Sequence, residues 1–254
     1  MKKAKSMELP QSFAARADEN PLSEDTVYTS IYEAIVEQRL PPGTKLPEEI
    51  LAEVFGVSRT MIRRALLRLA YDKVVETRPN RGAIVSQPTP HEAKSVFEAR
   101  RLLETAIIAK AVHHVEPEQI EALRATINEE AEAGHRGDRS TAIRLSGVFH
   151  LQLAQLSGNP VYVDFMRELI SLTSLIIALY EMPGNTGCIF DEHDGLLDAM
   201  LAKDEARAAR LMEEHLCKIE RRLNLDRQNG AIDLRQIFGS VHQPTKAARR
   251  RRAG

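Results

Sequence analysis

Hydrophobic residues recur at helical spacing along most of the chain, and the pattern is clearest in residues 48–70. Two short helices are expected there, joined by a turn at Gly56, because glycine tolerates the positive φ that such a turn often needs. Ser58 is a good N-cap for the second helix. Three residues should form the apolar side of the first helix: Ala52, Val54 and Phe55. Four should form the buried stripe of the second: Ile62, Ala65, Leu66 and Leu69.

A further helix and a β-hairpin flank this pair. The helix should begin near Ser23 or Asp25, end at about Gln38, and bury Val27, Ile31, Ala34 and Ile35. A turn and a short strand follow within residues 40–46. Two β-prone runs, 74–77 and 83–86, are separated by Arg-Pro-Asn-Arg-Gly, which is typical of a hairpin. Three helices and a terminal hairpin predict a winged helix-turn-helix.

The rest of the chain predicts helices and no strand. Thr89, Pro90 and Glu92 form a helix start with a capping box directly after a Gln-Pro-Thr-Pro linker. Glycine and proline residues divide the remainder into six predicted helices: 90–114, 117–133, 139–157, 160–182, 190–202 and 204–225. The fold class is therefore mainly α, with an N-terminal winged helix-turn-helix followed by an all-α helical bundle. The expected divisions are a flexible arm (1–21), the winged domain (22–88), the bundle (89–228) and a basic, disordered tail (229–254).

Composition supports a helical, cytoplasmic protein. The 254 residues are 43% hydrophobic but contain no tryptophan and only 5% aromatic residues, so the core must consist of aliphatic side chains. Cys188 and Cys217 have neither metal-type nor disulfide-framework spacing, which favours a reducing compartment. The N-terminal lysines precede no apolar run, so we expect no signal peptide. The most apolar segment, 170–180, is too short to span a membrane, which takes about 20 residues.

Charge is distributed unevenly along the chain although its net value is only −1. Residues 21–55 carry two basic and seven acidic residues, whereas residues 56–86 carry seven basic and two acidic residues. A near-neutral chain with a local basic face is typical of a specific nucleic-acid binder. The basic face would be the exposed side of the second helix of the pair, with Arg59, Thr60, Arg63 and Arg64. The alternative is a surface helical hairpin with solvated arginines.

Three histidines, His150, His193 and His215, lie on three different predicted helices, each beside an apolar stripe. Inward-facing imidazoles from three packed helices are a natural way to hold a divalent metal. The alternative is that each histidine is an ordinary core or surface residue. A catalytic zinc site would also fit three histidines, but the sequence contains no HExxH motif, no nucleophile motif and no paired acid and base beside them.

Two sets of motifs resemble a known family. The segments PPGTKL, LAEVFGVSRTMIRRALLRL and RPNRGAIV resemble the DNA-binding domain of GntR-type bacterial transcription regulators. The segments EARRLLETAIIA and FHLQLAQLSGN, followed by EH and a later HL, resemble the helical FCD effector domain of the FadR-like subgroup. The resemblance covers residues 22–222 approximately. It implies that the bundle binds an effector and dimerises.

The resemblance also implies the DNA contacts. Three residues of the second helix would contact bases: Arg59, Thr60 and Arg63. Arg64 would add a base contact or clamp a phosphate, and Lys45 would touch a phosphate or be solvated. Family members commonly carry an acidic residue at the position of Arg64 and often a proline at that of Met61, so the base preference should differ here. Arg81 and Gly82 would form the wing tip near the minor groove or backbone.

In the helical domain, the resemblance implies that the three histidines bind zinc or a similar ion. The family adds an aspartate one turn before the first histidine, where this chain has Ser146. Either water or an effector carboxylate then completes the shell, or the site is metal-free. Arg100 would point into the cavity and bind an anionic effector. The alternative for Arg100 is a surface ion pair with Glu104.

The sequence therefore predicts a ligand-responsive, DNA-binding transcriptional regulator. It would be a homodimeric repressor, released from a pseudo-palindromic DNA operator by a small carboxylate metabolite. Two alternatives remain at this stage: a metal-dependent enzyme that uses the three histidines, and an architectural DNA-binding protein. The large helical domain argues against the latter, because DNA packing does not need it.

Overall fold

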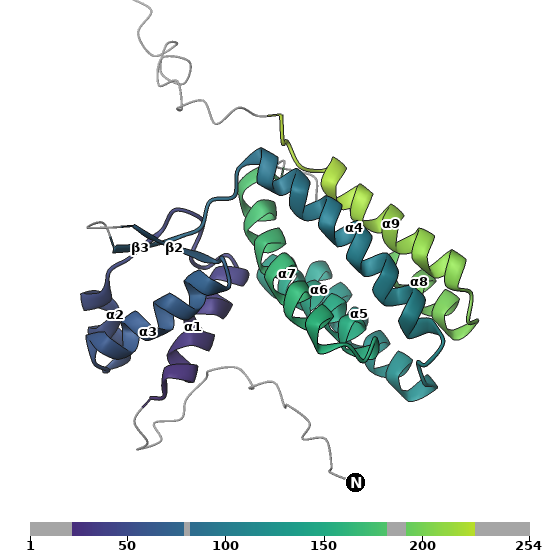
Figure 1. The fold of residues 1–254 in the computed structure, drawn as a ribbon, viewed down its shortest axis with the longest axis horizontal. Helices are drawn as coiled ribbons and strands as arrows, with labels where there is room; N and C mark the ends of the chain where they lie inside the picture. Colours follow the sequence, from purple (N-terminus) through teal and green to yellow (C-terminus); the bar gives the residue numbers. More distant parts are fainter. Residues whose placement is uncertain (1–21, 79–81, 182–191, 227–254) are drawn as a thin grey trace, which may run out of the picture.

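A computed structural model describes residues 22–78, 82–181 and 192–226, with nine helices and three strands in that part of the chain. It has an N-terminal part and a larger helical part, which lie side by side (Figure 1). The N-terminal part consists of α1 (Glu24–Val36), β1 (Lys45–Leu46), α2 (Glu48–Phe55), α3 (Arg59–Tyr71), β2 (Val75–Arg78) and β3 (Gly82–Val85). The strands pair antiparallel in the order β1-β3-β2. The predicted winged helix-turn-helix is confirmed.

Local sequence explains the ends of these helices. The Ser23 hydroxyl accepts a hydrogen bond from the Thr26 amide at the start of α1, and Ser58 caps α3 through the Met61 amide. Gly56 ends α2 in the left-handed conformation, with φ of 63°, as the turn requires.

The predicted stripes of α1 and α3 are buried, and they pack together with the strands into one core. The prediction for α2 was wrong at one residue, because Val54 is 73% exposed. The side of α2 that packs on the core consists of Leu51, Ala52 and Phe55, and Val54 lies beside this stripe. A helix of eight residues has room for only a narrow apolar face.

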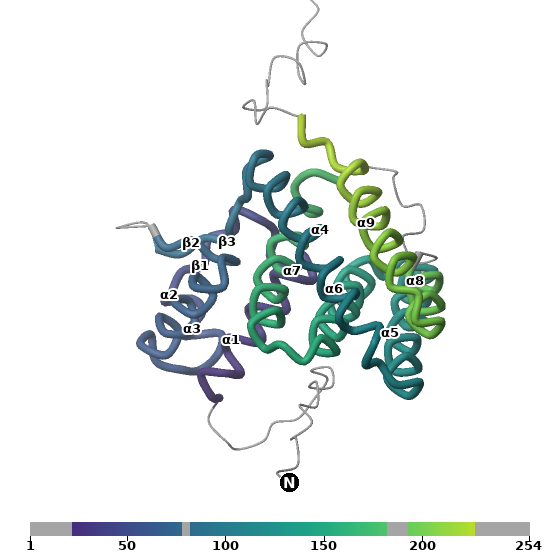
Figure 2. The backbone as a smooth tube through the Cα atoms, turned by 45° about the vertical axis from the view of Figure 1, so that its right-hand side comes forward, coloured from purple at the N-terminus to yellow at the C-terminus, as the bar shows by residue number. Residues whose placement is uncertain are grey.

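The helical part consists of α4 (Pro90–Val112), α5 (Pro117–His135), α6 (Arg139–Leu156), α7 (Pro160–Tyr180), α8 (Glu192–Leu201) and α9 (Glu205–Arg221). The capping box at the start of α4 is present as predicted. Helices α4 and α9 run side by side, α5 packs on α6, and α7 lies on the side that faces the N-terminal part (Figure 2). None of the helices in the described ranges is long and apolar enough to span a bilayer.

Hydroxyl groups of the helical part hold the C-terminal end of α1. The Ser174 hydroxyl donates a hydrogen bond to the Val36 carbonyl over 2.6 Å, and the Ser140 hydroxyl donates to the Glu37 carbonyl over 2.7 Å. These carbonyls lie at the end of α1, where the helix itself offers no donor. Tyr32 adds a bond of 2.6 Å to the Ser171 hydroxyl. The end of α1 is thus fixed by α6 and α7.

Candidate functional sites

The first candidate site is the exposed face of α3. The side chains of Arg59, Arg63 and Arg64 are 60%, 64% and 61% exposed, and Thr60 is exposed beside them. The inward stripe of α3 forces this orientation, because residues at the intervening positions are buried in the core. The structure therefore brings the four predicted contact residues together on one surface. Their contact with DNA remains a prediction.

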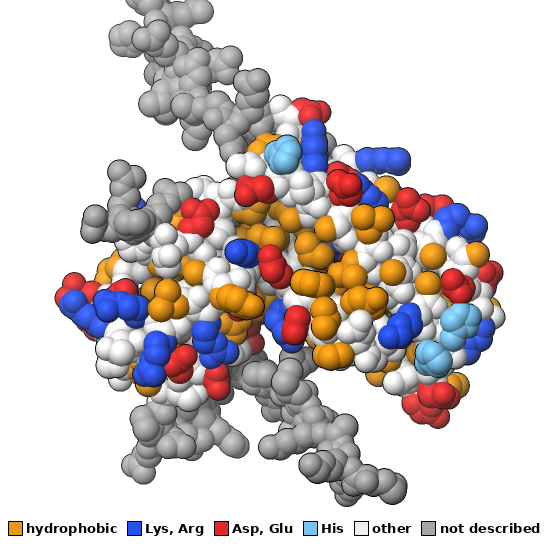
Figure 3. Space-filling model, viewed as in Figure 1, with side chains coloured by type: hydrophobic (Ala, Val, Ile, Leu, Met, Phe, Trp, Pro, Cys, Tyr) orange, Lys and Arg blue, Asp and Glu red, His pale blue; other side chains and the backbone are white. Residues whose placement is uncertain are grey.

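Acidic residues accompany these arginines. Arg63 forms a bidentate salt bridge with Glu48, with Nε–Oε1 and Nη2–Oε2 distances of 3.1 Å and 2.7 Å. This contact lowers the pKa of the Glu48 carboxyl and raises the pKa of Arg63. Arg59 contacts Glu49, the next residue of the same turn of α2, through its Nη2 atom alone. Figure 3 shows basic and acidic side chains interleaved over this end of the molecule.

The wing is only partly described. Lys45 is exposed in β1, and Gly82 begins β3 with φ of 77°, a conformation that favours glycine. Arg81 lies outside the described residues.

The second candidate site is a cavity of about 500 Å³ inside the helical part. Its wall comes from α4, α5, α6, α7 and the end of α9, and it includes Val36 from the last turn of α1. Its polar lining includes Arg100, Glu130, Ser146, His150, Thr173 and Ser174. A cavity of this size is typical of a small-molecule site. Because its wall includes Val36 of α1 as well as residues of the helical part, the cavity borders both parts of the protein.

Arg100 lies in the wall of this cavity, so the alternative of a surface ion pair with Glu104 is wrong. Arg100 and Glu104 are each 2% exposed, because α4 is packed against α6, α7 and α9. The Nε atom of Arg100 lies 2.6 Å from one Glu104 oxygen, and the other oxygen lies 2.5 Å from Nδ1 of His150. Nη1 of Arg100 donates to Thr173, and its buried Nη2 has no partner among the described residues.

The buried surroundings determine the protonation states of Glu104 and His150. Burial by itself would raise the pKa of Glu104, but the charge of Arg100 and the hydrogen bonds that Arg100 and His150 donate outweigh it and hold this pKa at about 2. Burial lowers the pKa of His150 and favours the neutral imidazole. A neutral His150 that donates from Nδ1 to Glu104 keeps a lone pair on Nε2, and this atom has no partner among the described residues.

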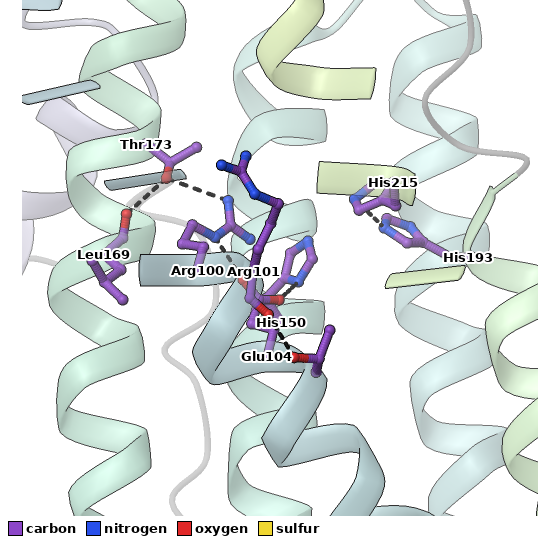
Figure 4. A network of polar contacts seen from close by, with 9 residues as sticks. Arg100, Arg101, Glu104, His150, Leu169, Thr173, His193 and His215 are labelled. Carbon is purple, nitrogen blue, oxygen red and sulfur yellow. Dashed lines mark hydrogen bonds and ion pairs between the residues drawn. The ribbon is translucent and has the colours of Figure 1, made fainter. Parts of the chain in front are cut away.

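The three predicted histidines meet beside the cavity (Figure 4). All three are at most 3% exposed, and one ring nitrogen of each lies within 4.8 Å of those of the others. The Nε2 atoms of His193 and His215 face each other over 3.2 Å. Behind His193, its Nδ1 lies 3.3 Å from the buried carboxylate of Glu130.

These residues fit a divalent metal. Carboxylates behind His150 and His193 favour the tautomers whose Nε2 lone pairs point forward, as in many zinc sites. Three imidazole nitrogens so close together satisfy one another poorly, because a neutral imidazole has only one donor. Ser146 lines the cavity one turn before His150 and offers no carboxylate.

Glu130 was missed in the sequence. It follows Leu123 and Ile127 on the buried stripe of α5, and an acidic residue at such a position was the available signal. Ser174 and Thr173 were also missed, because hydroxyls inside an apolar helix usually bond to their own backbone.

Two family models match the chain, one within each of the two parts of the structure. Residues 23–85 match the family described as bacterial regulatory proteins, gntR family, and residues 95–217 match the FCD domain. The chain is 22% identical to the HTH-type transcriptional repressor RspR of Escherichia coli, over 81% of this chain and 90% of that protein. It is 28% identical to the HTH-type transcriptional repressor NanR of an Enterobacter species, over 76% and 82% of the two chains.

Solved structures agree on the fold. The structure of E. coli McbR/YncC matches with a TM-score of 0.69 and 22% identity, over 77% of this chain and 93% of that one. A putative transcriptional regulator GntR from Rhodococcus matches with a TM-score of 0.69 and 22% identity, over 78% and 95%.

Proposed function

Since the chain belongs to the GntR family of bacterial regulatory proteins and carries an FCD domain, it is a DNA-binding transcription regulator, and we propose that it is a repressor released by an anionic metabolite. The enzyme and architectural alternatives are not supported, because the family and the named relatives are regulators.

Helix α3 would contact the bases of the operator. Arg59 and Arg63 reach solvent from its first two turns, where a guanidinium can bind guanine O6 and N7 together. Thr60 and Arg64 flank them, and Lys45 and Gly82 lie on the neighbouring sheet. A two-fold dimer would place two such helices on a pseudo-palindromic site.

The effector would be a small organic acid bound in the cavity. The observation that carries this proposal is the unpartnered, buried Nη2 of Arg100 beside the three histidines. A buried guanidinium with one unpartnered nitrogen that lines a cavity favours a carboxylate. Zinc or a similar ion, held by His150, His193 and His215, would supply a second, Lewis-acidic anchor for the same ligand.

Ser146 would make room for that ligand. In this chain the position before His150 carries a hydroxyl instead of the acidic ligand expected from the family, so the protein itself supplies only neutral first ligands. The effector's carboxylate would then complete the ion's coordination. The buried Glu104 and Glu130 would balance part of the charge from behind the histidines.

The cavity and the DNA-binding part share one wall, which would link ligand binding to DNA release. Ser174 lines the cavity and also donates to the Val36 carbonyl at the end of α1. A ligand that takes the Ser174 hydroxyl as its own partner would leave this buried carbonyl unsatisfied. The change would favour a different placement of α1, as an allosteric ligand requires.

A homodimer would form through the outer face of α4 and α7. Leu102 on α4 is 71% exposed, and Val161 and Phe165 on α7 are 53% and 56% exposed. Figure 3 shows hydrophobic side chains gathered over these two adjacent helices. Exposed apolar patches of this kind usually mark an interface, and a second copy would cover this face isologously.

Elemental analysis tests the metal and effector proposal. The protein, purified without a histidine tag, should contain about one divalent ion per chain, whereas His150→Ala and His193→Ala should contain little. His135→Ala is the matched control, because His135 lines the cavity rim but does not belong to the cluster.

In a thermal-shift screen of organic acids, a compound that stabilises the parent should lose its effect in Arg100→Gln. A metal-free parent, or stabilisation that survives Arg100→Gln, contradicts the respective half of the proposal.

A further inference from the structure

All four exposed arginines of α3 contact acidic residues at the beginnings of α1 and α2. Arg59 pairs with Glu49, and Arg63 with Glu48 at 2.7 Å. The other row of arginines faces α1: Arg64 lies 3.3 Å from Glu24, and Arg68 lies 2.5 Å from Asp25. We call Glu24, Asp25, Glu48 and Glu49 the four counterions.

The pairing has a consistent geometry. The four counterions are the first two residues of α1 and the first two residues of α2. The arginines stand in two rows along α3, each row with a spacing of one turn, and each row faces one of these helix starts. Two separate helices thus present their acidic ends to the same DNA-reading surface.

The ion pairs between the α3 arginines and the four counterions change how strongly this surface attracts DNA. Nonspecific DNA attracts a protein mainly through phosphates, and each neutralised phosphate releases counterions. A phosphate that approaches a paired arginine must displace a carboxylate, and it meets that carboxylate's repulsion as well. The four counterions therefore reduce the attraction of this surface to DNA in general.

A base edge can be read while a pair stays intact. Arg63 meets Glu48 through Nε and one hydrogen of Nη2. Its Nη1 and the other Nη2 hydrogen still form a fork, and this end of the guanidinium is the one that binds guanine O6 and N7. Glu48 also fixes the direction of that fork. Loss of the pair should thus favour phosphate contact over base contact.

From this arrangement we propose that Glu24, Asp25, Glu48 and Glu49 are specificity-determining residues of the DNA-binding surface. They compete with phosphates for the α3 arginines and so suppress nonspecific DNA binding, while Glu48 holds Arg63 in its base-reading direction. This inference rests on the proposal that α3 reads the operator. Acidic residues also stabilise helix N-termini, but that effect does not require an arginine opposite each of them.

Binding to a short random-sequence duplex tests the proposal. The variants are Glu48→Gln/Glu49→Gln and Glu24→Gln/Asp25→Asn. Near physiological salt, each should bind this duplex roughly three- to tenfold more tightly than the parent. The slope of log affinity against log salt should steepen by about one to two, because each freed arginine can neutralise a phosphate. Binding to genomic fragments retained by the parent should tighten less, so the specificity ratio falls.

Glu53→Gln is the control for loss of an exposed carboxylate that does not pair with α3, and its effect is compared per charge removed. Glu53 is exposed on α2 and has no ion pair with α3 in the described part of the chain. If each paired variant behaves like Glu53→Gln in both affinity and salt slope, the proposal is overturned. Arg59→Ala/Arg63→Ala distinguishes a wrong DNA-binding surface from a wrong role of the four counterions. If this change leaves specific binding intact, α3 is the wrong surface; if specific binding is lost while the paired variants match Glu53→Gln, only the counterion proposal fails. Circular dichroism melts confirm that all variants are folded.

Discussion

Replacing Leu102 and Phe165 by alanine should dissociate the proposed dimer. Both side chains are more than half exposed in the single chain, on two helices that pack side by side. Burying the exposed part of each would contribute about 1–2 kcal/mol. Each residue occurs twice in an isologous interface, so the double variant should lose roughly 4–8 kcal/mol of association free energy. This is about a thousandfold or more in the dimer Kd.

Sedimentation velocity over a concentration series measures this change. The parent should sediment as a dimer at concentrations where Leu102→Ala/Phe165→Ala sediments as a monomer. Ile50→Ala/Val54→Ala is the matched control, because both residues are large, exposed and hydrophobic but lie on α2. A Leu102→Ala/Phe165→Ala variant that dimerises as tightly as this control would refute the assignment of the interface to α4 and α7.

Four further predictions follow from the described contacts and from the sequence. Ser174→Ala should leave the Val36 carbonyl unsatisfied, at a cost of about 1–3 kcal/mol, and speed hydrogen exchange in the last turn of α1; unchanged exchange there would contradict the link. Chelation should lower the melting temperature, since an ion at a hundred times its Kd contributes about 2.7 kcal/mol, and an unchanged melt would argue against the ion. The pKa of Glu92 lies below its ordinary value of 4.5 because it accepts hydrogen bonds from Thr89, so its stabilising effect exists above pH 4.5 and is lost as pH falls through the lower folded value; acid titration of Glu92→Gln should therefore lack this component. Removing residues 244–254 should flatten the salt dependence of DNA binding without changing sequence preference, and a constant slope would assign the tail no phosphate contact.

Periodicity predicted the helices well because each of them buries one stripe. The stripe of α3 was read directly from Ile62, Ala65, Leu66 and Leu69, and all four are buried. The glycine and proline residues between the helices then set the ends to within a few residues. Val54 was misplaced because a short helix gives a pattern too brief to orient it.

The polar sites were harder to predict, since their geometry depends on contacts between distant segments. The histidines could be proposed as a group because each lay beside an apolar stripe, and the structure brings them together. The sequence left open whether Arg100 and Glu104 were exposed, because an i,i+4 pair looks the same on a surface and in a core. Glu130 and the pairing of the α3 arginines depend on how α5, α1 and α2 are placed, which spacing along one helix does not determine.

Selection of genomic DNA fragments by the purified protein tests whether α3 reads the operator. The parent protein should enrich sites with two related half-sites. Arg59→Ala/Arg63→Ala should remain folded and dimeric but enrich none above random DNA, because each lost base contact costs about 1–3 kcal/mol per half-site. If the variant enriches the same sites as the parent, a surface other than α3 reads the DNA.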